Sequence, residues 1–283
     1  MLAAKLSDTF GGLFFFGKMQ DNATMALLLS LFAGASTAIG AALAFVVRRD
    51  DMRFFALGMS FSAGVMIYLS FMDILPMSIE RMKEGFGADA ARFGHFCAVL
   101  AFFAGVLAAG VIDYFVPEHV DGEMVEEAHS APHVGGARKT ALFTALALAI
   151  HNFPEGLSVF VSGLDDLTVG AGVAIAITLH NIPEGMSVAL PVYSATGDRR
   201  KAFVWGSLSG FAEPLGALLA YLFLAPYLTP ITVGAALAFT AGLMVYISLD
   251  ELLPMAKEYG REHYGIVGVF AGMALMAAVS IVF

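Results

Sequence analysis

Hydrophobic residues gather in eight long runs along the chain, and short polar segments separate these runs. A run of about 20 apolar residues, folded as a helix, is long enough to cross a hydrocarbon core about 30 Å thick. The pattern therefore predicts an all-α integral membrane protein, with one transmembrane domain over residues 1–283. The predicted spans are residues 25–47, 54–79, 93–116, 140–163, 168–194, 202–224, 232–256 and 264–283.

Part of the second run recurs in the seventh. Residues 64–80 read GVMIYLSFMDILPMSIE and residues 242–258 read GLMVYISLDELLPMAKE, an offset of 178 with eight of seventeen positions identical. The second and seventh spans cross in opposite directions, so this is an inverted repeat. It predicts a 3+2+3 arrangement, in which helices 1–3 and 6–8 flank a central pair. Inverted repeats that meet at a mid-membrane site are typical of transporters.

Lysine and arginine are distributed unequally between the two ends of the predicted spans. Cytoplasmic connectors are enriched in these residues, so the richer side is predicted to be cytoplasmic. This places both termini, and the turn at Asp165 and Asp166, on the outer side. Ten basic residues fall on the inner side, namely Arg48, Arg49, Arg53, Arg138, Lys139, Arg199, Arg200, Lys201, Lys257 and Arg261, against Lys5, Lys18, Arg81, Lys83 and Arg92 on the outer side.

Composition agrees with a membrane location. The chain is 59% hydrophobic and only 14% charged, whereas soluble domains carry roughly 25% charged residues. No basic cluster is long enough to indicate a nucleic-acid partner. The single cysteine, Cys97, excludes an intramolecular disulfide framework and a multi-thiolate metal site.

The longest connector, residues 117–139, is acidic and carries three histidines, His119, His129 and His133. It is either a solvated tether or a cytoplasmic segment that collects metal ions. Its low apolar content favours the tether.

Two copies of one polar motif interrupt the central apolar runs. HNFPEG occupies residues 151–156 and HNIPEG occupies residues 180–185. In each copy the His and the Glu are one helical turn apart and share a face. Both motifs lie about 13 residues from the turn between them, which predicts the same depth near the middle of the membrane. Ionisable residues are costly there and usually functional.

A third acid, Glu213, precedes a proline within the sixth run. Three carboxylates, those of Glu155, Glu184 and Glu213, could not all stay ionised in a low-dielectric site without a cation. Imidazole, amide and carboxylate ligands suit divalent ions such as Zn²⁺, Fe²⁺, Mn²⁺, Co²⁺ and Cd²⁺. The candidate metal ligands are His151, Asn152, Glu155, His180, Asn181, Glu184 and Glu213.

Other polar residues lie between the motifs and the two membrane faces. The repeat places Asp73 near the outer end of the second span, and Asp250 with Glu251 near the inner end of the seventh. Asp113 lies near the inner end of the third span. These acids are candidate entrance and exit positions, and each can also be an interfacial charge without a transport role. Two serine stripes continue from the motifs, Ser158 and Ser162 outward and Ser187 and Ser194 inward, as half-channels or as packing residues.

The doubled HNxPEG motif, GFAEPLG at 210–216, the 3+2+3 arrangement and the His-bearing loop resemble the ZIP (Zrt-, Irt-like) family of divalent metal transporters, and within it the bacterial ZupT-type branch. The resemblance covers nearly the whole chain. It implies import of zinc and other divalent metals across the inner membrane, and a homodimer. It also implies a binuclear centre: one site from His151, Glu155, His180 and Glu184, and a second from Asn152, Asn181 and Glu213, with Glu155 and Glu184 bridging.

Two other functions are alternatives to a transporter. An intramembrane metalloenzyme would be expected to carry HExxH or several His boxes, and the sequence has neither. A polar core without metal would leave costly ionisable groups at mid-membrane with no role. The sequence leaves open the preferred metal, the driving force (protons, bicarbonate or the metal gradient), carrier versus channel mechanism, and the oligomeric state.

Overall fold

The structure is a computed structural model, and it describes residues 2–43, 45–46, 52–115, 152–164, 166–224, 227, 229–259 and 262–282. The described residues are almost all helical and contain no strand, which confirms the predicted all-α class. Five helical stretches in this part of the chain are long and apolar enough to cross a membrane, and Gly265–Ile281 is a shorter apolar helix. The five are Asn22–Leu43, Ala56–Phe86, Ala88–Tyr114, Arg199–Phe223 and Pro230–Leu252.

Helices account for most of the described part of the chain. Besides the helical residues 152–164, they are α1 (Leu2–Leu43), α2 (Met52–Leu69), α3 (Leu75–Phe86), α4 (Ala91–Phe115), α7 (Leu167–Thr196), α8 (Arg199–Leu208), α9 (Ala212–Leu219), α10 (Pro230–Ile247), α11 (Leu253–Tyr259) and α12 (Glu262–Val282). Short π-helical segments are η1 (Ser70–Ile74), η4 (Ala220–Leu224) and η6 (Ser248–Leu252), and short 3₁₀ segments are η2 (Ala88–Ala90) and η3 (Ser209–Phe211).

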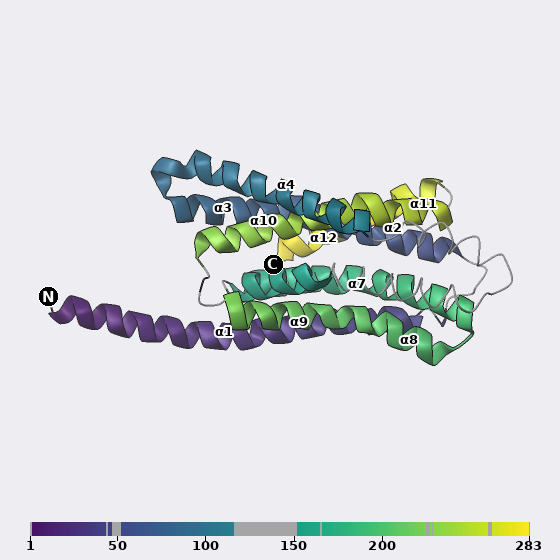
Figure 1. The fold of residues 1–283 in the computed structure, drawn as a ribbon, viewed down its shortest axis with the longest axis horizontal. Coiled ribbons are helices and arrows are strands. Elements are labelled where there is room, and N and C mark those ends of the chain that lie inside the picture. The colour runs from purple at the N-terminus through teal and green to yellow at the C-terminus, as the bar shows by residue number, and fades with distance from the viewer. Residues whose placement is uncertain are drawn as a thin grey trace.

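Two groups of helices lie side by side (Figure 1). One group contains α1, α7, α8 and α9, and α1 runs along α7 over much of its length. The other contains α2, α3, α4, α10, α11 and α12, with α2 against α12 and α10 against α4. Contact between α2 and α7 joins the groups. The motif-bearing helix α7 therefore faces both.

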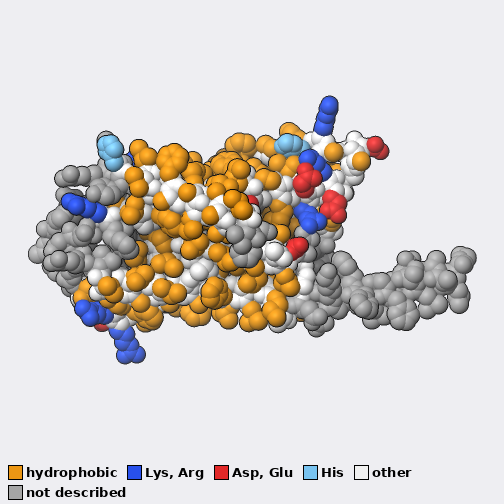
Figure 2. Space-filling view, turned by 180° about the vertical axis from the view of Figure 1, so that it is seen from behind, with side chains coloured by type: hydrophobic (Ala, Val, Ile, Leu, Met, Phe, Trp, Pro, Cys, Tyr) orange, Lys and Arg blue, Asp and Glu red, His pale blue; other side chains and the backbone are white. Residues whose placement is uncertain are grey.

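On the face shown in Figure 2, hydrophobic side chains cover the middle of the molecule, and charged side chains gather towards its two ends. On α4 alone, Phe93, Phe96, Leu100, Phe103 and Leu107 are each more than half exposed. An apolar surface this large is costly in water, and it suits contact with hydrocarbon.

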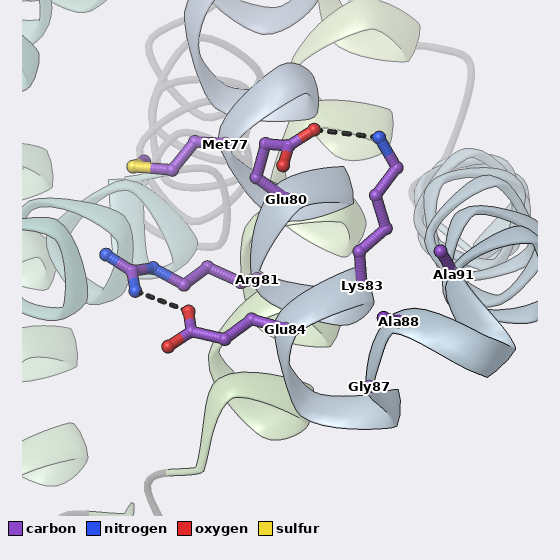
Figure 3. Close-up of a pocket in the computed structure, with 8 residues that line it drawn as sticks. All are labelled: Met77, Glu80, Arg81, Lys83, Glu84, Gly87, Ala88 and Ala91. Carbon is purple, nitrogen blue, oxygen red and sulfur yellow. Dashed lines mark hydrogen bonds and ion pairs between the residues drawn. The ribbon is translucent and has the colours of Figure 1, made fainter.

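The second predicted span is longer as a helix than its apolar run. Helix continues through α3 to Phe86 and ends at Gly87, whose φ of 83° is one that residues with a side chain rarely adopt. The added turns are polar, and ion pairs hold them: Lys83 to Glu80 at 2.8 Å and Arg81 to Glu84 at 2.9 Å (Figure 3). These charges pair with one another, and the pocket that they line lies at the exposed end of this helix.

The sequence repeat has a counterpart in the helix geometry. The π-helical segments η1 and η6 begin at Ser70 and Ser248, which are the same 178 residues apart. In each, the first residue of the following α-helix donates its amide to the carbonyl five residues earlier. Pro76 and Pro254 follow and lack the N–H that an α-helical bond would use, so the wider turn accompanies the proline.

Close helix contacts repeat with the same symmetry. Each of four glycines faces a backbone carbonyl of a neighbouring helix, and the contacts form two mirrored pairs: Gly64 with Val269 and Gly242 with Phe102, then Gly272 with Phe61 and Gly105 with Phe239. The mirrored contacts relate α2 to α10 and α4 to α12, as an inverted repeat requires. The number of spans and their sidedness stay predictions.

Candidate metal centre

Three of the predicted ligands converge where residues 152–164 and α7 meet. One ligand atom from each of Glu155, His180 and Glu184 lies within 4.8 Å of the other two. The Nε2 atom of His180 is 3.2 Å from the Oε2 atom of Glu155. All three side chains are at most 1% exposed. Packing of two helices therefore assembles a buried nitrogen and oxygen cluster.

A second contact brings in Glu213, at the beginning of α9. The side-chain amide of Asn181 donates to Glu213 Oε1, and also to the backbone carbonyl of Ala33 on α1 at 2.9 Å. Both Asn181 and Glu213 are fully buried. One asparagine therefore joins three helices beside the carboxylates.

The last glycine of each motif allows a neighbouring helix to come close. A Cβ atom at Gly156 would overlap the backbone carbonyl of Glu213, and one at Gly185 would overlap that of Thr37. Absence of a side chain lets α9 and α1 approach the turns that carry Glu155 and Glu184. Helix packing therefore explains why both copies of the motif end in glycine.

The cluster has more acceptors than protein donors. Glu155 Oε1, Glu213 Oε2 and Asn181 Oδ1 are buried oxygens with no hydrogen-bond partner among the described residues. Burial of ionised carboxylates without partners costs several kcal/mol each. A divalent cation would satisfy these atoms, and a set of carboxylate, imidazole and amide ligands suits zinc and harder ions.

Other predicted residues lie away from this cluster or outside the described residues. His151 lies outside the described residues, as do His119, His129 and His133 of the connector. Asn152 is fully buried, and neither atom of its side-chain amide has a partner in the described part of the chain. The candidate entrance and exit acids are remote from the cluster in sequence and form separate contacts.

The outer acid, Asp73, is half-buried in η1 and accepts a hydrogen bond from Ser280 of α12 at 3.1 Å. At the predicted inner end, the Tyr246 hydroxyl donates to Asp113 at 3.3 Å, and Asp250 is also within hydrogen-bonding reach of that hydroxyl. Asp250 is exposed and Glu251 half-buried. Tyr246 therefore connects two acids that the sequence treats separately.

Sequence reasoning missed several supporting residues. Ser62 on α2 donates to the backbone carbonyl of His180 at 3.4 Å, holding α2 against α7 at the cluster. Ser280 and Tyr246 support the outer and inner acids. Hydroxyl side chains within apolar helices are common, and of these three residues only Tyr246 lies within the sequence repeat that could have marked it.

The chain is similar in sequence to a family of zinc transporters and to individual bacterial members of it. The sequence model of the family described as ZIP Zinc transporter matches residues 115–280. The zinc transporter ZupT of Campylobacter jejuni is 48% identical over 277 residues, covering 89% of this chain and 94% of the relative. That of Chlorobium luteolum is 49% identical over 265 residues, covering 91% and 97%. That of Streptococcus mutans is 44% identical over 268 residues, covering 94% and 100%.

These matches extend over the motif-bearing helices and nearly the full length of the relatives. Together with its long apolar helices, they make the chain a multi-pass membrane protein. The chain belongs to the ZIP family of zinc transporters.

Proposed function

We propose that this protein imports zinc, and also iron, manganese, cobalt and cadmium as divalent ions, across the inner membrane. The observation that carries the proposal is the buried convergence of Glu155, His180 and Glu184 between apolar helices. The relatives named zinc transporters support zinc as a substrate. The family consists of transporters, so the metalloenzyme alternative is set aside.

Two adjacent ions form the proposed transport site. His151, Glu155, His180 and Glu184 hold one ion, while Asn152, Asn181 and Glu213 hold the other, and Glu155 and Glu184 bridge them. The contact between Asn181 and Glu213 supports the second group, because it places an amide and a carboxylate beside the first. Zinc bonds to nitrogen and oxygen are about 2 Å long, so ligands already within 4.8 Å need only small movements.

The proposed path runs from one membrane face to the other. Asp73 attracts ions at the outer face, and Asp113, Asp250 and Glu251 receive them at the inner face. The contact of Tyr246 with Asp113 supports an inner cluster. The histidines of residues 117–139 are at most an accessory cytoplasmic binding segment.

The proposed function includes a membrane orientation and an oligomeric state. Both termini lie on the outer side, because ten of the fifteen lysines and arginines then fall in cytoplasmic connectors. The protein forms a homodimer within the lipid bilayer. Cysteine accessibility at each connector in intact cells tests the orientation, and the mass of the purified protein in detergent tests the dimer.

Uptake into vesicles tests the transport function. Purified protein in proteoliposomes should take up zinc in a saturable manner, with competition by the other four ions. Glu155→Ala should lose uptake. Glu84→Ala removes a carboxylate from an exposed ion pair and serves as the matched control. Absence of zinc uptake by the wild-type protein, or equal uptake by Glu155→Ala, would contradict the proposal.

A further inference from the structure

The symmetry that relates α2–α4 to α10–α12 also relates α1 to the segment of η3 and α9. Gly34 of α1 and Gly210 of η3 face each other's backbone carbonyls, as residues beside a two-fold axis do. Their offset is 176 residues. At the same offset, Gly40 faces the carbonyl of Ile182 while Gly216 faces that of Phe153, and these partners are 29 residues apart, like the two motifs.

This relationship gives Glu213 a counterpart on α1. Gly156 faces the carbonyl of Glu213, and the equivalent Gly185 faces the carbonyl of Thr37. Residues 37 and 213 are also 176 apart. Thr37 therefore occupies, in the first half of the protein, the position that a metal-site carboxylate occupies in the second half.

The two halves differ in what these positions contact. Glu213 accepts a hydrogen bond from Asn181, and the symmetry pairs residue 37 with Asn152 in the same way. Thr37 is too short for that contact, and its hydroxyl donates instead to the carbonyl of Gly34 at 2.8 Å. Asn152 is fully buried and neither amide atom has a partner among the described residues. In the first half of the protein, the amide equivalent to that of Asn181 therefore lacks the carboxylate partner that Glu213 provides in the second half.

The missing carboxylate changes the charge of the loaded centre. Two divalent ions carry four positive charges, whereas Glu155, Glu184 and Glu213 supply three negative charges. A glutamate at position 37 would balance the charge. In a buried site of low dielectric, one uncompensated charge strongly weakens retention of the second ion. A transport site must bind its ion firmly enough to fill and weakly enough to empty.

We propose that Thr37 keeps the metal centre one carboxylate short, so that two bound ions destabilise each other and the second is released. This inference rests on the proposed function, because it assumes that the cluster is the transport site. It concerns the strength of ion retention, and not which residues form the cluster.

Paired substitutions of equal size test the proposal. Thr37→Glu and Thr37→Gln introduce the same steric change against Gly210 and differ only in charge. In detergent, Thr37→Glu should bind the second zinc ion at least about tenfold more tightly than Thr37→Gln, in line with one added charge near a divalent ion. In proteoliposomes its maximal uptake rate should fall below that of Thr37→Gln. Equal second-ion affinity and equal rates in the two variants would overturn the proposal.

A rescue experiment tests the symmetry directly. Glu213→Gln should lose binding of the second zinc ion, and adding Thr37→Glu should restore it, because the carboxylate then lies at the mirrored position beside Asn152. The matched double variant with Thr37→Gln should not be rescued, and equal behaviour of the two double variants would refute the mirrored position. If Thr37→Glu is not recovered folded, the shorter pair Thr37→Asp and Thr37→Asn makes the same comparison.

Failure of this inference can be separated from failure of the proposed function. Zinc binding by the wild-type protein and its loss in Glu155→Ala test the site itself. If those results hold while the two residue-37 variants behave alike, only the role of Thr37 is wrong. If the wild-type protein binds no zinc, the transport site is wrong.

Discussion

The Nε2 atom of His180 lies 3.2 Å from the Oε2 atom of Glu155, although the two residues belong to different helices and are 25 positions apart in sequence. Both are fully buried among apolar residues. Packing of the helices thus holds an imidazole and a carboxylate within reach of one ion. Such preorganisation lowers the cost of replacing the water around an incoming ion.

Loss of a bridging carboxylate should be more severe than loss of a motif asparagine. Glu155→Ala and Glu184→Ala each remove a charge that would serve two ions, so we expect zinc uptake to fall by more than about 100-fold, beyond the usual effect of losing a supporting group. Asn152→Ala and Asn181→Ala remove neutral amides, and we expect a loss of only about tenfold. Initial uptake rates in proteoliposomes measure both. Equal loss in the asparagine and glutamate variants would show that our order of importance is wrong.

Gly156 should not tolerate even one added methyl group. A Cβ atom there would overlap the backbone carbonyl of Glu213, so Gly156→Ala should push α9 away and cost about 1–3 kcal/mol of stability as an overpacked site. Zinc binding should weaken as well, because Glu213 moves with its backbone. Gly265→Ala is the matched control, since a Cβ atom at Gly265 meets nothing within 4 Å. Similar melting temperatures and zinc affinities for the two variants would argue against the close approach.

Asp198 caps the N-terminus of α8 in the connector after α7, and its protonation should affect stability. Its Oδ1 atom accepts from the backbone amides of Arg200 at 3.0 Å and Lys201 at 3.2 Å. The amide of Lys201 is the main cause that holds the pKa of Asp198 below its usual value of 3.8. A carboxylate with a lowered pKa stabilises the fold above its usual pKa, and this contribution is lost as the pH falls through the lowered value.

Melting temperatures of three proteins test this cap. At pH 7, Asp198→Ala should melt below Asp198→Asn, because asparagine can still cap the helix. The advantage of the wild-type protein over Asp198→Asn should disappear at pH values well below 3.8, where the carboxylate is protonated. An advantage that does not change with pH would show that charge at residue 198 has no effect on stability.

The polar cluster was more predictable than its surroundings. Equal spacing of the two motifs from one turn was enough to predict that they lie at the same depth, because helix rise is nearly constant. The grouping of Glu155 with His180 came from the family resemblance. Contacts made by backbone groups, such as Asn181 with the carbonyl of Ala33, have no sequence signal. Thr37 is a single hydroxyl in an apolar helix, and few identities accompany its offset of 176 from Glu213. Tertiary contacts were needed to show that offset.

The sequence also predicts the ends of helices only in part. The apolar run predicts a span ending at residue 79, whereas the helix continues to Phe86. Hydrophobicity reports where a helix is covered by lipid or protein, but ion pairs one turn apart can extend it into water. The His-bearing connector and His151 lie outside the described residues, so their predicted roles stay predictions.

Removal of most of that connector should leave transport intact. Deletion of residues 120–136 removes His129 and His133 but lies outside every predicted span. We expect zinc uptake to remain within about threefold of the wild-type rate, because loops outside the spans tolerate deletion. The response of uptake to metal on the cytoplasmic side should change instead. Complete loss of uptake with normal membrane insertion would place the connector in the transport path.

Alternating access predicts reciprocal exposure of the two serine stripes. Ser158 lies one turn from Glu155 towards the predicted outer face, is 1% exposed, and donates to the carbonyl of Glu155 at 2.8 Å. Ser187 is the equivalent residue after Glu184, towards the inner face. An inverted repeat offers two nearly equivalent packings, and only one end of the path is open in each.

Single cysteines at Ser158 and Ser187, in a Cys97→Ser background, should therefore react reciprocally with a membrane-permeant thiol reagent. Conditions that expose one position should protect the other. A gradient with zinc only outside should favour labelling at one of the two positions. The reverse gradient should favour labelling at the other. A channel would label both positions together whenever the path is hydrated, and simultaneous labelling that zinc does not change would rule out alternating access while leaving the metal ligands in place.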